Sequence, residues 1–260
     1  MLSLPFLFLG ATLLYAGAVF LNDVFDADYD REHHPLRPLP AQTLSEQACW
    51  RSAVALLVCG ALLLLGCGFG SGALALALVL IVIVYNTIHR LVPVGPLLHG
   101  VARCLLYLLG ASIADRGLTG WSIWCGLAAA AYVSGVDYFS LSLRSSGRRR
   151  LWPLWLLAVP VALALVMDVG RYRETGVLLS VVLVLWCLRS LRQTFWSIEP
   201  NVKSTVDGLF AGIVFSDWLA TCPANFASYG NRAAQQVSVA FLALFVLTLL
   251  LKKWGAKRQT

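Results

Sequence analysis

Long apolar runs recur along the whole chain, and they restrict its fold more than any other feature. Each run has roughly the 20-residue length that a helix needs to cross a bilayer. The composition agrees, because 59% of the 260 residues are hydrophobic and only 13% are charged, against about 25% charged residues in a typical soluble domain. The sequence predicts nine membrane-spanning segments, at residues 4–21, 50–66, 73–88, 96–114, 119–141, 151–167, 177–195, 202–222 and 233–251.

These segments should be helices. In lipid, backbone N–H and C=O groups must be hydrogen-bonded within the protein, and a helix does this within a single segment. A transmembrane barrel would need strands of alternating polarity, whereas the Leu, Val and Ala runs here are continuous. The connections are short and leave no room for a soluble domain. We therefore predict an all-α membrane protein, a polytopic bundle of about nine transmembrane helices that forms one domain over residues 1–260.

The positive charges predict how the chain sits in the membrane. Of the twenty Lys and Arg residues, fifteen fall on the side that holds the loop after the first segment and the C-terminus, and four fall on the other side. Cytoplasmic loops carry such an excess, so we expect that loop and the C-terminus in the cytoplasm of a cell-membrane protein. Because the charges are spread over several loops, they favour contact with lipid headgroups or a phosphorylated substrate, and no nucleic acid.

A dense acidic stretch directly follows the first apolar run. On a helix, Asp23, Asp26 and Asp30 fall within about 60° of one another, with Asn22 at the edge of the same face, whereas Asp28 points the other way. Like charges at this spacing repel one another, so a cation between them is favoured. Ligands that are all oxygen favour a hard ion, Mg²⁺ before Zn²⁺. The alternative is a solvated acidic loop at a helix end.

Several motifs resemble those of one family, the UbiA superfamily of intramembrane prenyltransferases. The acidic stretch, with the Arg-Pro-Leu-Pro sequence that follows it, looks like the first motif of that superfamily. Later segments look like its fourth-helix region and its second site, and the likeness is closest to the UbiA-like branch of bacterial ebo clusters. The matching segments are Asn22 to Asp30, Arg37 to Pro40, Tyr85-Asn86, Gly95 to Arg103, Leu108 to Gly110 and Tyr132 to Ser140.

The resemblance implies a reaction and its catalytic residues. In such enzymes a prenyl group passes from an isoprenoid diphosphate to a lipophilic acceptor within the membrane, and Mg²⁺ grips the diphosphate. The metal ligands would be Asn22, Asp23, Asp26 and Asp30. The same three carboxylates and Asp137, at the second site, would be the catalytic residues. The metal would neutralise charge that grows on the diphosphate as the allylic C–O bond breaks.

Five further residues are candidates for binding the substrate. Arg37 lies in a proline-rich loop that cannot be helical and so stays near the carboxylates. Arg103 is the only Arg within a predicted span, where charge is costly and usually functional, although a structural ion pair would also explain it. Tyr85 could face a carbocation or merely pack. His89 stands where the family has a Lys, and Arg144 follows Asp137 on the same helical face.

Two departures from the family pattern leave an alternative open. Asp137 stands alone at the second site, because position 141 is Leu, and it could be an ordinary polar patch at a helix end. The family usually has one more helix before the first motif, so we expect this chain to lack one N-terminal helix. The alternative function is that of a non-catalytic UbiA-like protein that binds or transports a lipophilic metabolite. A cation transporter fits less well, because carriers place carboxylates near the bilayer midplane.

Overall fold

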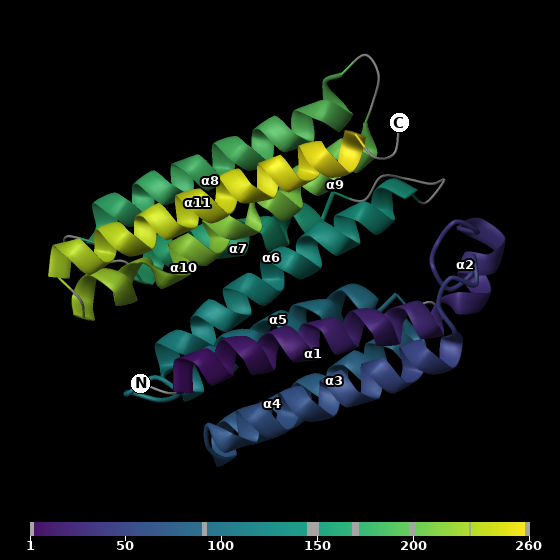
Figure 1. The fold of residues 1–260 in the computed structure, drawn as a ribbon. Coiled ribbons are helices and arrows are strands. Elements are labelled where there is room, and N and C mark those ends of the chain that lie inside the picture. Colours follow the sequence, from purple (N-terminus) through teal and green to yellow (C-terminus); the bar gives the residue numbers. More distant parts are fainter. Residues whose placement is uncertain are drawn as a thin grey trace. The chain divides into compact units, whose positions relative to one another are not determined.

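The computed structural model describes residues 3–89, 93–144, 151–167, 172–197, 201–228 and 230–257. These residues form eleven α-helices and no strand (Figure 1), which confirms the all-α fold class. The helices are α1 (Ser3–Phe25), α2 (Ala27–His33), α3 (Glu46–Gly66), α4 (Phe69–Ile88), α5 (Gly95–Ser112), α6 (Gly120–Arg144), α7 (Pro153–Met167), α8 (Tyr172–Phe195), α9 (Val202–Ala211), α10 (Ile213–Ser228) and α11 (Gly230–Lys257).

Every predicted segment overlaps a helix, with one correction. The segment predicted at 202–222 is not a single helix, because it is divided between α9 and α10 at Gly212. Among the described residues, four helices are long and apolar enough to cross a bilayer, and two shorter apolar helices accompany them. The exact number of nine spans stays a prediction. The four long candidates are Leu4–Phe25, Glu46–Gly66, Phe69–Ile88 and Arg173–Phe195.

The chain divides into two compact units, residues 1–126 and 127–260, and each is described by itself. The prediction of a single domain stays a prediction. In the first unit α1, α3, α4 and α5 pack around a core of aliphatic side chains, and α2 follows α1 (Figure 1). The buried core residues are Leu14, Leu21, Ala53, Leu57, Leu64, Ala75, Leu78 and Leu109.

Glycines bring α1 and α3 into close contact. A Cβ atom on Gly10 would lie 2.7 Å from Cγ of Leu64, and one on Gly60 would lie 2.8 Å from the carbonyl oxygen of Gly10. A Cβ on Gly17 would lie 2.8 Å from Cγ of Leu57. Small residues at these positions let the two backbones approach, which is how helices gain packing energy in lipid. This close contact fixes the part of α1 that precedes the acidic stretch against α3.

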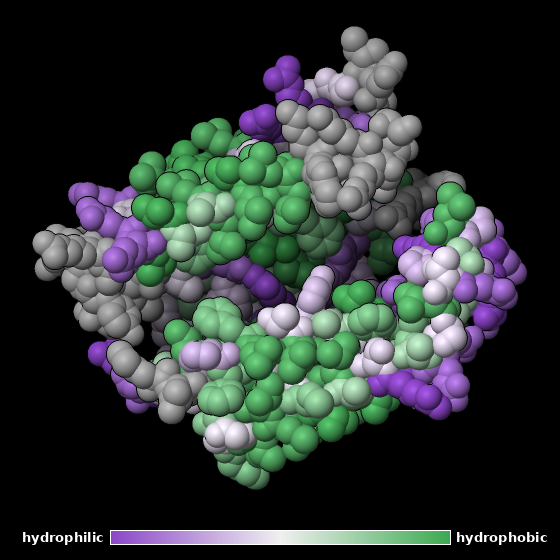
Figure 2. Space-filling model, viewed as in Figure 1, coloured by the Kyte–Doolittle hydropathy of each residue, from purple (hydrophilic) through white to green (hydrophobic). Residues whose placement is uncertain are grey.

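The outer faces of the first unit are apolar. Large side chains such as Phe8, Leu62 and Leu76 are more than half exposed. Figure 2 shows hydrophobic residues over much of the visible surface of α1, α3 and α4, and hydrophilic residues around α2. Exposed apolar surface on this scale indicates contact with another apolar phase. Together with the long apolar helices, it identifies a multi-pass membrane protein.

The second unit is built around the break between α9 and α10. At the break, N–H of Gly212 donates to the carbonyl oxygens of Gly208 (3.2 Å) and Leu209 (3.0 Å). Two side chains supply further donors: the Tyr132 hydroxyl bonds the Leu209 carbonyl at 2.9 Å, and Trp186 Nε1 bonds the Gly208 carbonyl at 2.7 Å. The two carbonyls share one backbone donor at the break, and each gains a side-chain donor, which satisfies them in an apolar surrounding.

Hydroxyl groups also join α8 to α9. The hydroxyls of Thr194 and Thr205 lie 2.7 Å apart, and the Thr205 hydroxyl donates to the carbonyl oxygen of Ser190 at 2.9 Å. Thr205 is fully buried and the other two residues are nearly so. These groups are neutral, and each has an acceptor or donor within the same unit. They therefore account for helix packing without a bound ligand.

Candidate functional site

The acidic stretch keeps its helical register across the junction of α1 and α2. The junction lies at Asp26, yet N–H of Asp26 donates to the carbonyl of Asn22 and N–H of Asp30 donates to that of Asp26, both at 2.9 Å. These are bonds between residues four apart, as in an α-helix. The rotation of 100° per residue therefore continues from Asn22 to Asp30, so the acidic side chains keep the facing that helical geometry assigns to them.

Burial separates the acidic residues as the helical facing predicts. Asp30 and Asp26 are 2% and 9% exposed, and Asp23 is partly buried. The side chain of Asp28, by contrast, is 95% exposed and pairs with Arg31. Burying a carboxylate is costly unless it has charged or hydrogen-bonding partners. The two buried carboxylates therefore indicate a site with its own counter-charges.

One counter-charge is Arg37. Its Nη1 lies 2.5 Å from Oδ2 of Asp30, and its side chain remains half exposed. The loop around it is closed by local bonds: N–H of Ala41 donates to the Arg37 carbonyl, and the Thr43 hydroxyl donates to the Pro38 carbonyl, each at 2.9 Å. The structure thus brings Arg37 to the carboxylates, where the proline-rich loop was expected to hold it.

A histidine at the end of α4 also lies against the carboxylates. Nε2 of His89 lies 3.5 Å from Oδ1 of Asp26, while Nδ1 lies 3.1 Å from the carbonyl oxygen of Tyr85. The His89 ring also stacks on the Tyr85 ring, with centroids 4.9 Å apart. Both residues therefore lie beside the acidic stretch.

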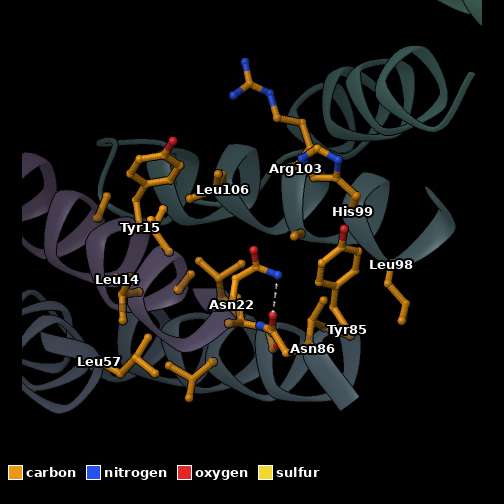
Figure 3. A pocket seen from close by; sticks show the side chains of 18 residues that line it. Leu14, Tyr15, Asn22, Leu57, Tyr85, Asn86, Leu98, His99, Arg103 and Leu106 are labelled. Carbon is orange, nitrogen blue, oxygen red and sulfur yellow. Dashed lines mark hydrogen bonds between the residues drawn. The ribbon is translucent and has the colours of Figure 1, made fainter. Parts of the chain in front are cut away.

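An apolar pocket of about 390 Å³ lies between α1, α4 and α5. Its walls are mainly Leu, Val, Ile and Ala side chains, and a few polar groups lie among them (Figure 3). One of these is Asn22, whose Nδ2 donates to Oδ1 of Asn86 at 3.0 Å. Asn22, which lines the pocket, directly precedes Asp23 in the chain and lies one helical turn before Asp26. The polar lining residues are Tyr15, Asn22, Tyr85, Asn86, His99 and Arg103.

Arg103 is placed differently from the other charged candidates. It lines the pocket, but in Figure 3 its guanidinium points away from the pair of Asn22 and Asn86. Its Cζ atom lies 5.9 Å from the centroid of the Tyr107 ring. The structure therefore puts Arg103 on the pocket wall, with its guanidinium turned away from Asn22 and Asn86.

The remaining two candidates belong to the second unit. Asp137 lies on α6 with a partly buried side chain, between the buried residues Ser134 and Ser140. Arg144 is the last residue of that helix, and its side chain lies outside the described residues. The structure therefore places Asp137 and Arg144 relative to the other residues of the second unit only.

Sequence reasoning did not single out Asn86 as a site residue. It is 5% exposed, and its amide bonds both Asn22 and the carbonyl of Val82. One signal was present, because Asn86 is a lone amide at the end of an apolar run. The partner of that amide lies 64 residues away in the chain, and no local pattern reports a contact of that kind.

The donors at this site suit a hard cation. Asn22, Asp23, Asp26 and Asp30 offer only amide and carboxylate oxygens, which Mg²⁺ prefers. Among the described residues, no group of three or more His, Cys, Asp and Glu side chains could hold a metal by themselves. Mg²⁺ in phosphate-binding enzymes is usually held by one or two carboxylates together with the substrate phosphates. The residues therefore fit an ion that is shared with a diphosphate.

Comparison with known proteins identifies the family. The sequence pattern of the UbiA prenyltransferase family matches residues 2–214, which is most of the chain. Comparisons with curated proteins and with solved structures found no match. Members of this family are membrane prenyltransferases, and they generally use Mg²⁺ bound at acidic motifs. With its all-helical fold and buried carboxylates beside an apolar pocket, this chain belongs to the UbiA prenyltransferase family.

Proposed function

We propose that this protein transfers a prenyl group from an isoprenoid diphosphate to a lipophilic acceptor within the membrane, with Mg²⁺. One observation carries the proposal. The buried carboxylates of Asp26 and Asp30, with Arg37 against Asp30, lie one and two helical turns beyond Asn22, which lines an apolar pocket. An isoprenoid diphosphate has the same division, with a charged head and an apolar tail. The site therefore matches both ends of one substrate.

The charged end would bind the diphosphate. Asn22, Asp23, Asp26 and Asp30 would hold Mg²⁺, which supplies positive charge against the growing negative charge of the leaving group. The Arg37 guanidinium, half exposed beside Asp30, can turn to the phosphate oxygens, because Arg pairs well with phosphate. We assign further contacts with the diphosphate to His89, Arg103 and Arg144.

The apolar end would hold the prenyl chain and keep water out. In the reaction, the allylic C–O bond breaks and its electron pair leaves with the diphosphate. The nucleophilic atom of the acceptor then forms the new bond to carbon and gives up a proton. The ring of Tyr85 lines the pocket near its polar end, where an aromatic face can stabilise positive charge on the allylic carbon. Asp137 stays a proposed catalytic residue on the likeness of its motif.

A second candidate function rests on a specific observation. Leu141, where the family has a second carboxylate, is a half-exposed apolar side chain on α6. This favours a UbiA-like protein that binds or transports a lipophilic metabolite without transfer. We also propose that the chain belongs to the ebo-like branch, which likewise lacks the full second motif.

The decisive experiment measures transfer of label from a radiolabelled isoprenoid diphosphate to a membrane lipid extract, using the purified protein with and without Mg²⁺. We expect a labelled lipid product that depends on Mg²⁺ and is lost in Asp30→Asn. Binding of the diphosphate without transfer to any acceptor would favour the second candidate. A protein that binds no isoprenoid diphosphate would contradict the proposed transfer reaction.

We also propose that the acidic stretch and the C-terminus face the cytoplasm, as the charge bias indicates. Ala41, which is exposed in the loop after α2, is a suitable reporter. A single Cys placed there in a background without other cysteines should not react with an impermeant reagent applied to intact cells. Labelling from outside would reverse the orientation.

A further inference from the structure

Two amide side chains at the polar end of the pocket are bonded in series. Nδ2 of Asn86 donates to the carbonyl oxygen of Val82 at 2.8 Å, within α4. Nδ2 of Asn22, on α1, donates to Oδ1 of Asn86 at 3.0 Å. Asn86 is buried, and Asn22 is partly buried against the pocket. The series therefore runs from a backbone carbonyl of α4 to the residue that begins the acidic stretch.

This series fixes which end of each amide faces which partner. A carbonyl oxygen can only accept, so Asn86 must turn its NH₂ group toward Val82. Its oxygen then faces Asn22, which must present an NH₂ group in turn. The oxygen of Asn22 is left to face away from Asn86, and Figure 3 shows it turned into the pocket. The assignment follows from the donors and acceptors themselves, which is how amide orientation is settled.

We propose that Asn86 is a positioning residue that fixes the side-chain amide of Asn22 with its oxygen toward the bound cation. The inference rests on the proposed function. An amide can ligate Mg²⁺ through oxygen, whereas its NH₂ group carries partial positive charge and no lone pair suited to a hard ion. Without Asn86, the Asn22 amide is free to flip and present the wrong end. Groups that orient metal ligands typically contribute 10- to 100-fold to affinity.

The test measures binding of Mn²⁺, as a spectroscopic substitute for Mg²⁺, to the full-length protein in detergent. Mn²⁺ is titrated by electron paramagnetic resonance in the presence of unreactive farnesyl thiodiphosphate, and Mg²⁺ is used to displace it. Replacing Asn86 by Leu, of similar size, should weaken Mn²⁺ binding about tenfold or more. In an Asn22→Ala background the same Asn86→Leu change should have no further effect, because the ligand that it orients is gone.

A rescue separates orientation from mere support of the fold. A carboxylate at position 22 has an oxygen on both sides, so its flip does not matter. The double variant Asn22→Asp/Asn86→Leu should therefore bind Mn²⁺ within about threefold of Asn22→Asp alone, well inside the effect expected of a lost orienting group. An equal loss from Asn86→Leu in the unaltered protein and in the Asn22→Asp background would overturn the inference, as would no loss in either.

A substitute variant covers the case in which Asn86→Leu does not fold, and binding to the unaltered protein distinguishes failure of this inference from failure of the proposed function. If Asn86→Leu does not fold, Asn86→Asp takes its place, because its carboxylate still accepts from Asn22 and should preserve Mn²⁺ binding. A folded Asn86→Asp protein that has lost Mn²⁺ would contradict the orienting role. If the unaltered protein binds neither Mn²⁺ nor the thiodiphosphate, the proposed function fails. If it binds both and Asn86→Leu binds equally well, only the inference fails.

Discussion

The two units bury polar groups of different kinds. In the first unit the buried groups include the carboxylates of Asp26 and Asp30, paired with Arg37 and His89. In the described part of the second unit the buried polar groups are hydroxyls, such as those of Thr194 and Thr205. Both kinds lie in a chain of apolar helices, yet they are satisfied differently. The Thr194 and Thr205 hydroxyls bond each other and backbone carbonyls, whereas the Asp30 carboxylate lies against the charged Arg37.

The free-energy cost of burial indicates which of these polar groups support the fold and which bind a ligand. A neutral hydroxyl between helices costs little once bonded, and such bonds typically contribute about 0.6 kcal/mol in membranes. A buried carboxylate costs several kcal/mol, and a hydrophobic replacement of the pair is often as stable. Charged groups are therefore poor devices for holding helices together. Their presence beside an apolar pocket is better explained by binding, and the predictions below test that contrast.

The largest expected effect is on the buried carboxylates. Asp26→Asn and Asp30→Asn should each weaken Mg²⁺-dependent binding of an isoprenoid diphosphate by about 100-fold, or ~2.7 kcal/mol, because each removes a buried negative charge that the cation needs. Equilibrium binding of a labelled isoprenoid diphosphate, with and without Mg²⁺, measures this. Asp28→Asn is the matched control, since its side chain is 95% exposed. Equal losses from all three would show that the stretch acts merely as an acidic loop.

The second prediction concerns Asp137. Of the two charged candidates in the second unit, it is the one whose side chain the structure describes. Asp137→Asn should lower the rate of prenyl transfer more than about tenfold, which corresponds to about 1.4 kcal/mol of lost transition-state stabilisation. Single-turnover transfer measures it, and expression and detergent stability should be unchanged. Asp207→Asn, another partly buried Asp in this unit, serves as the control. An unchanged transfer rate in Asp137→Asn would show that Asp137 is not a catalytic residue.

Local sequence patterns predicted the helices and the acidic face, because both depend on residues near one another in the chain. The length of an apolar run indicates a span, and the rotation per residue places Asp26 and Asp30 together and Asp28 apart. The break at Gly212 was not predicted. It depends on donors from Tyr132 and Trp186, which lie far away in the sequence.

The candidate site was predictable to the same extent. Asn22, Asp26, Asp30 and Arg37 lie within one short stretch, and the motif indicated them. The contact between Asn22 and Asn86 joins α1 to α4, and the direction of the Arg103 side chain depends on the packing of α5. Such features follow from tertiary packing, which the spacing of residues within a segment does not report.

The third prediction tests the structural side of the comparison. Thr205→Val should lower the free energy of unfolding by about 1 kcal/mol, because it removes the bonds to Thr194 and to the carbonyl of Ser190 while keeping the side-chain volume. Binding of the isoprenoid diphosphate should be unaffected. Unfolding in mixed detergent measures the first and equilibrium binding the second. Thr248→Val, whose hydroxyl bonds the Leu244 carbonyl within α11, is the control. A loss of binding in Thr205→Val would show that the hydroxyl network belongs to the site.

The smallest effect is expected at Arg31. This residue lies at the end of the acidic stretch, six residues before Arg37. Arg31 pairs with Asp28 and, at 3.3 Å, with Glu46, and all three side chains are more than half exposed. Exposed ion pairs contribute about 0–1 kcal/mol, because water screens the charges and the long side chains lose freedom. Arg31→Gln should therefore change diphosphate binding by less than about fivefold, the equivalent of that 1 kcal/mol. Arg37→Gln, assayed alongside, removes the partner of a buried carboxylate and serves as the positive control. If Arg31→Gln proved as harmful as Arg37→Gln, positive charge anywhere in the loop would suffice, and burial would not mark the functional residues.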